Sequence, residues 1–181
     1  MNDDQHHPAG RRIDRIRDAG FVAGLGELSL DDLRERRDEC LAEREYLSLL
    51  RRLVQGRAEI LQAELATRGT DDGDRTWLIE RLSTILTADE HHEASRGEAV
   101  KVGLPEDELL LARRRIERLA ADAGISDPTT LDDERLAAAV ELLTDEEQEV
   151  SAARREVIAV LETVQDELKR RYKQDPSLVL R

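Results

Sequence analysis

The chain has 181 residues, and its 41 acidic residues outnumber its 28 basic ones, giving a formal net charge of −13. Aromatic residues make up only 2 % of the chain and there is a single cysteine, which excludes a β-sandwich or barrel, a disulfide framework and a cysteine-ligated zinc site. No apolar run is long enough to span a membrane, and the first residues lack the pattern of a signal peptide. We expect an all-α protein in the cytoplasm whose negative charge opposes direct DNA binding.

The N-terminal region is polar and is interrupted by four glycines. We expect residues 1–26 to form a disordered arm, followed by a single helical coiled-coil domain over residues 27–181.

A first long helix is predicted over about residues 30–68. Ser29 is a suitable N-cap, and acidic residues in the first turn favour the positive end of the helix. Apolar residues then recur at every seventh position, as in the seam of a coiled coil: Leu33, Cys40, Leu47, Val54 and Leu61.

Two shorter helices are predicted next, over about residues 75–87 and 105–123, with Pro105 suited to the first helical position and Gly124 to the C-cap. A second long helix follows over about residues 131–172. It repeats the seven-residue spacing: Leu136, Leu143, Val150, Val157 and Val164. Each apolar seam needs a cover, so we expect the two long helices to pair within one chain.

The two long helices resemble one another at an offset of 103 residues, which places Ser48 on Ser151. Each copy carries a polar row at steps of three and four residues, so that its members share one side of the helix. The first row is Arg44, Ser48, Arg51, Gln55 and Glu59, and the second is Glu147, Ser151, Arg154, Ile158 and Glu162. Such a row is either a solvated face with intrahelical salt bridges or a binding surface.

The stretch from Glu45 to Leu61 resembles the first signature helix of the RsiG family, the cyclic di-GMP-dependent anti-sigma factors of the actinobacterial sporulation sigma factor WhiG. Residues 147–155 resemble the second signature helix. The signature runs Glu, three residues, Ser, two residues, Arg, three residues, Gln, three residues, Asp. This chain departs from it at four positions: Arg44, Glu59, Ile158 and Glu162.

The resemblance implies an antiparallel helix pair that binds cyclic di-GMP and sequesters a WhiG-like sigma factor, and so regulates transcription. The residues that it assigns to cyclic di-GMP are Ser48, Arg51, Gln55, Glu59, Glu147, Ser151, Arg154 and Glu162, with Arg44, Arg52 and Arg155 as accessory candidates. Arginine can take a phosphate or a guanine edge in bidentate fashion, which suits this ligand.

Other chemistry is disfavoured by the sequence. The adjacent His91 and His92 lie in an acidic loop and suggest no metal site, and Cys40 falls on the apolar seam. We therefore expect no catalytic residues, no bound metal and no enzymatic activity. Two alternatives to the nucleotide-controlled anti-sigma factor stay open: a coiled-coil adaptor, and an RsiG-like anti-sigma factor that has lost nucleotide control.

Overall fold

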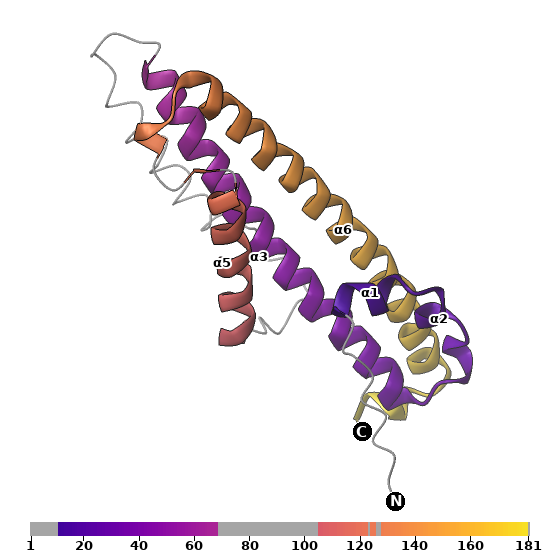
Figure 1. Ribbon diagram of the computed structural model, residues 1–181. Helices are drawn as coiled ribbons and strands as arrows, with labels where there is room; N and C mark the ends of the chain where they lie inside the picture. Colours follow the sequence, from indigo (N-terminus) through magenta and orange to yellow (C-terminus); the bar gives the residue numbers. More distant parts are fainter. Residues whose placement is uncertain (1–10, 69–104, 123, 126–127, 181) are drawn as a thin grey trace, which may run out of the picture. The chain divides into compact units, whose positions relative to one another are not determined.

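The computed structural model describes residues 11–68, 105–122, 124–125 and 128–180, and Figure 1 shows their helices. These residues contain no strand, which confirms the all-α class. The chain divides into two compact units. We call Met1–Leu47 together with Ala152–Arg181 the terminal unit, and Ser48–Ser151 the central unit.

Two long helices, α3 (Leu30–Arg68) and α6 (Asp133–Gln174), each contribute one part to each unit. α3 starts with a reciprocal cap, because the Asp32 amide donates to the Ser29 hydroxyl at 3.1 Å and the Ser29 amide donates to the Asp32 carboxylate at 3.3 Å. α6 begins after Asp132, whose carboxylate accepts a hydrogen bond from the Arg135 amide at 2.8 Å. The predicted long helices are confirmed.

In the terminal unit, the start of α3 lies beside the end of α6. The Arg34 Nε donates to the Tyr172 hydroxyl at 3.2 Å, and Arg171 donates to the Leu28 carbonyl at 2.6 Å. The helix segments of this unit therefore run antiparallel. The seam residues buried here are Leu33, Cys40, Leu47, Val157 and Val164.

In the central unit, the end of α3 lies beside the start of α6, with Arg68 Nη1 at 3.3 Å from Asp133 Oδ1. The segments are again antiparallel. The seam residues buried here are Val54, Leu61, Leu136, Leu143 and Val150. None of the ten predicted seam side chains is more than 4 % exposed, so the predicted burial of both seams is confirmed.

Helix α5 (Glu106–Asp122) belongs to the central unit and confirms the helix predicted over about residues 105–123. It packs through the buried Ala112 and Ile116 and through an Arg115–Glu146 ion pair of 2.7 Å. Gly124 follows the helix with φ 68°, a left-handed conformation that favours glycine. The Ile125 amide donates back to the Ala120 carbonyl at 2.8 Å, which closes a Schellman cap.

The N-terminal region differs from the predicted disordered arm. Residues 11–27 form α1 (Arg12–Arg17), α2 (Ala19–Val22) and a 3₁₀ turn, η1 (Leu25–Glu27). These elements are too short to be stable alone, and their order comes from tertiary contacts that bury Ile16 and Phe21. Residues 1–10 of the predicted arm lie outside the described residues.

Two further short 3₁₀ elements complete the described chain, η3 (Pro128–Thr130) before α6 and η4 (Pro176–Leu180) after it. The helix predicted over about residues 75–87 lies outside the described residues. Across the part of the chain that is described, no helix combines the length and apolar character needed to cross a membrane.

Candidate functional site

The polar row on the central-unit part of α3 is continuous. Arg51 Nη1 donates to Gln55 Oε1 at 3.3 Å, and Gln55 Nε2 donates to Glu59 Oε1 at 3.1 Å. Both bonds join residues four positions apart, which stand one above the other on a helix. Three of the five residues of the predicted row, Arg51, Gln55 and Glu59, therefore form a chain of contacting side chains. Ser48 lies half-buried on the same helix and has an interaction of its own.

The matching part of α6 meets this row. The Ser151 hydroxyl donates to Glu147 Oε1 at 2.8 Å, and the same carboxylate oxygen lies 3.5 Å from Arg51 Nη1. Within the central unit, five predicted residues thus form one connected path from Glu59 through Gln55, Arg51 and Glu147 to Ser151. The Arg51–Glu147 pair is the link between the two helices in that path.

The link is partly open to solvent. The Arg51 side chain is 38 % exposed and the Glu147 side chain is 27 % exposed. An ion pair at such a position contributes about 0–1 kcal/mol to stability. The Arg51–Glu147 contact can therefore be replaced by contacts of either side chain with a ligand, at little cost to the stability of the fold.

The remaining predicted residues are distributed over both units. Arg154 is half-buried in the terminal unit and is engaged in an interaction there, while Glu162 and Arg155 are exposed. Arg44, also in the terminal unit, pairs with Glu45 of its own helix at 2.9 Å. Arg52 is exposed in the central unit and also has an interaction.

The chemistry of the central-unit path is that of polar recognition. A guanidinium fork can bind a phosphate or the O6 and N7 edge of guanine, and carboxylates accept from guanine N–H groups. The amide of Gln55 can serve as donor or acceptor, and the Ser151 hydroxyl is small enough for a ligand to approach closely. The path holds both signs of charge within one contacting set, as a ligand with anionic phosphates and hydrogen-bonding bases requires.

Metal and thiol chemistry find no support in the described part of the chain. No group of three His, Cys, Asp or Glu residues there is arranged to hold a metal ion. Burial raises the pKa of the Cys40 thiol to about 12, and the charges of Glu39 and Glu43 add to that rise. The thiol is therefore protonated and unreactive near neutral pH. His91 and His92 lie outside the described residues.

The terminal unit holds a second charged cluster, which the sequence did not predict. Arg12, Arg15 and Arg17 of α1 each bind a glutamate of α3 or α6. The only signal for it in the sequence is the basic spacing Arg-x-x-Arg-x-Arg around Ile16, within a segment expected to be disordered.

Comparison with known proteins gives one family. The model of the RsiG-like family matches residues 20–86, a segment that contains the complete first polar row, whereas the second row lies outside the match. No curated protein matches the chain. Residues 20–86, which include the first polar row, are therefore similar to the RsiG-like family.

Proposed function

We propose that this protein is a cytoplasmic anti-sigma factor that sequesters a WhiG-like sigma factor of sporulation under the control of cyclic di-GMP. The single observation that supports nucleotide control is the path of polar side chains joined across α3 and α6 by Arg51 and Glu147. The family match over residues 20–86 supports the sigma factor partner.

The proposed ligand suits the residues of the path. Cyclic di-GMP carries two phosphodiester charges, which favour a guanidinium such as that of Arg51. Its two guanines each offer an acceptor edge to arginine and N–H donors to a carboxylate such as Glu147. Ser48, Gln55 and Glu59 would add contacts along α3.

The formal charge of −13 supports a protein partner with basic surfaces. Sigma factors bind DNA and so present such surfaces, and complementary charge raises the rate of association. The same charge disfavours direct contact of this protein with DNA.

A second candidate is a coiled-coil adaptor in which the row is only a salt-bridge network. It is favoured by the fact that Arg51, Gln55 and Glu59 already satisfy one another without a ligand. An intermediate candidate is an anti-sigma factor without nucleotide control, favoured by Ile158, which stands where the family signature has Gln.

Isothermal titration calorimetry of the purified chain with cyclic di-GMP, with and without a WhiG-like sigma factor, separates the three. We expect weak binding to the chain alone and much tighter binding beside the sigma factor, because the signature is incomplete. Cyclic di-AMP, with the same phosphodiesters and different bases, is the control ligand. If the chain binds the sigma factor equally well with and without the nucleotide, the result supports an anti-sigma factor without nucleotide control. If it binds neither the sigma factor nor cyclic di-GMP, the result supports the adaptor.

A further inference from the structure

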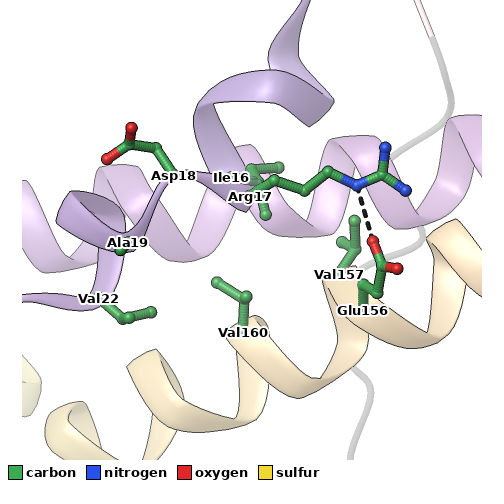
Figure 2. Close-up of a pocket in the computed structure, with 8 residues that line it drawn as sticks. All are labelled: Ile16, Arg17, Asp18, Ala19, Val22, Glu156, Val157 and Val160. Carbon is green, nitrogen blue, oxygen red and sulfur yellow. Dashed lines mark hydrogen bonds and ion pairs between the residues drawn. The ribbon is translucent and has the colours of Figure 1, made fainter.

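The first helix, α1, places three basic side chains on the surface of the terminal unit, and α2 follows it. We call α1 and α2, residues 12–22, the N-terminal strap. Arg12 Nε lies 2.7 Å from Glu43 Oε2 and Arg15 Nε lies 2.8 Å from Glu39 Oε1, both on α3. On the other helix, Arg17 Nε lies 2.7 Å from Glu156 Oε2 of α6, the contact drawn in Figure 2.

The surface under the strap requires a basic occupant. Glu43 is the only charged residue that is buried among the described residues, at 4 % exposure. A buried carboxylate without a cation is strongly unfavourable, so Glu43 depends on the guanidinium of Arg12 or on a substitute for it. Ile16, 2 % exposed, lies among the three basic residues and supplies the apolar contact.

The strap does not fill the apolar surface on which it rests. A cavity of about 240 Å³ remains beside it. Figure 2 shows Ile16, Ala19 and Val22 on the strap side of this cavity and Val157 and Val160 on the α6 side. An unfilled apolar boundary forfeits dispersion contacts, so α1 is held by the burial of Ile16 together with its three ion pairs. Of these pairs, Arg17–Glu156 is about half exposed on both sides and is screened by salt.

The rest of the N-terminal segment is held differently. Arg36 donates to the Phe21 carbonyl, and its guanidinium lies 5.2 Å from the centre of the Phe21 ring. Arg171 donates to the Leu25 carbonyl at 2.9 Å. Between α1 and this anchored part, Asp18 has an extended backbone (φ −65°, ψ 132°) and caps α2. α1 is therefore a separate element attached to a fixed one through a single extended residue.

We propose that the surface beneath α1 is a docking site for a basic amphipathic helix of a protein partner, with α1 as its internal competitor. The surface consists of Glu39, Glu43, Glu156, Val157 and Val160. The partner helix presents two or three Arg or Lys residues around one aliphatic side chain, as α1 does. This inference uses none of the polar-row residues and stands or falls independently of nucleotide binding.

Internal competition explains how a short, unstable helix can hold the surface. A six-residue helix has little stability of its own, but its tether gives it a millimolar effective concentration. A longer external helix with the same charge pattern displaces α1 when it binds the surface tightly enough to outcompete α1 at that effective concentration.

The test uses a fluorescein-labelled peptide with the sequence of residues 11–22 as the probe. Its binding to the full chain and to the triple variant Arg12→Glu/Arg15→Glu/Arg17→Glu is measured by fluorescence anisotropy. Charge reversal detaches α1 and leaves the acidic surface intact, so the peptide should bind the variant at least tenfold more tightly than the wild-type chain. Binding should fall as salt rises from about 0.1 M to 1 M, where the screening length drops from about 10 Å to 3 Å.

Two matched variants control for net charge and for strap release. Arg113→Glu/Arg114→Glu/Arg118→Glu makes the same charge change on exposed residues of α5 and should bind the peptide no better than wild type. Glu39→Gln/Glu43→Gln/Glu156→Gln should raise hydrogen exchange in the strap yet bind no peptide. Equal binding to wild type and strap variant, or binding to neither, would overturn the proposal. If the triple variant loses its helical circular dichroism, the single variant Arg17→Glu replaces it, because the partner of Arg17, Glu156, is exposed. The peptide should then bind the single variant about threefold more tightly than the wild-type chain.

Discussion

An arginine clamp of the same design occurs in each unit, and the two copies differ in solvent exposure and in one further ion pair, from Arg68 to Asp133. In the terminal unit, Arg171 donates to the carbonyls of Leu25, Gly26 and Leu28, the segment just before α3. It also pairs with Glu167 one turn earlier, at 3.0 Å. Its side chain is 17 % exposed.

In the central unit, Arg68 donates to the carbonyls of Pro128, Thr129 and Leu131, the segment just before α6. It pairs with Glu64 one turn earlier, at 2.9 Å. Every position of this clamp lies 103 residues from its counterpart in the terminal unit, the same offset that aligns the polar rows.

The clamps are the same while the polar rows have diverged, and the difference separates architecture from recognition. A clamp binds backbone carbonyls, which any residue provides, and it fixes the entry of the chain into a long helix. The rows bind through side chains, and here Arg44 stands opposite Glu147 in the alignment and Gln55 opposite Ile158. The shared clamp supports the predicted duplication, and the divergent rows indicate that the two copies do not make identical ligand contacts.

The largest effect should come from removing the terminal clamp. Arg171→Ala removes the guanidinium from three carbonyls and leaves Glu167 with Arg170 as its remaining arginine, and we expect a loss of about 3 kcal/mol in the free energy of unfolding, measured by urea denaturation. Arg68→Ala should cost less because its clamp is more exposed. The control is Arg170→Ala, whose exposed guanidinium binds Glu167 alone and should change stability by about 0–1 kcal/mol. Equal losses at Arg170 and Arg171 would contradict the clamp.

The loss of folding stability at low pH should also depend on the terminal clamp. Hydrogen bonds from Arg170 and then Arg171 lower the pKa of Glu167 from 4.5 to about 2. Because its pKa is lowered in the folded state, the Glu167 carboxylate stabilises the protein at pH values above its ordinary pKa of 4.5. This contribution is lost as the pH falls from about 4.5 to about 2. Glu167→Gln should flatten the loss of stability in this window, followed by thermal melts. An unchanged acid limb would show that other carboxylates dominate it.

Arg51→Ala tests the recognition side of the comparison. If the row binds cyclic di-GMP, losing this charge-assisted contact should weaken binding at least tenfold, since about 1.4 kcal/mol is one decade. Stability should change by only about 0–1 kcal/mol, because the Arg51–Glu147 pair is partly exposed. Arg154→Ala, the equivalent position of the second row, should weaken binding to a similar extent.

Arg57→Ala is the matched control, since Arg57 is an exposed arginine on the same helix and lies outside the row. The salt-bridge alternative predicts a modest loss of stability in Arg51→Ala and no ligand effect. If saturating cyclic di-GMP leaves the melting temperature of the wild-type chain unchanged in the presence of the sigma factor, the proposal of nucleotide control is wrong.

The sequence predicted what local spacing determines. A seven-residue apolar repeat leaves only one side of each long helix suited to burial, and the ten seam residues follow it. The contacts from Arg51 to Gln55 and from Gln55 to Glu59 follow from four-residue steps on one helix. Glycine at position 124 marked the end of α5 for the equally local reason that a left-handed residue is needed there.

What the sequence missed depends on contacts between distant residues. The α1 helix has six residues, too few to show a period, and its Arg17 is paired with a residue 139 positions away. The contact between Arg51 and Glu147 depends on the register of two antiparallel segments. A heptad repeat indicates which side of a helix is covered but does not fix which residues of the partner lie opposite.

The smallest predicted effect concerns the position where the second row lost its amide. Ile158 is half-buried, between Arg154 and Glu162, each one turn away along the same helix. Gln55 has the same spacing to Arg51 and Glu59 and bonds both of them. Ile158→Gln should restore such a bridge and tighten cyclic di-GMP binding by about 0.5–1.5 kcal/mol, up to roughly tenfold in Kd by calorimetry. Ile60→Gln, the same change at an exposed position of α3, should leave Kd unaltered. Unchanged affinity in Ile158→Gln as well would mean that the second row does not contact the nucleotide there, and that only the clamps kept the symmetry of the duplication.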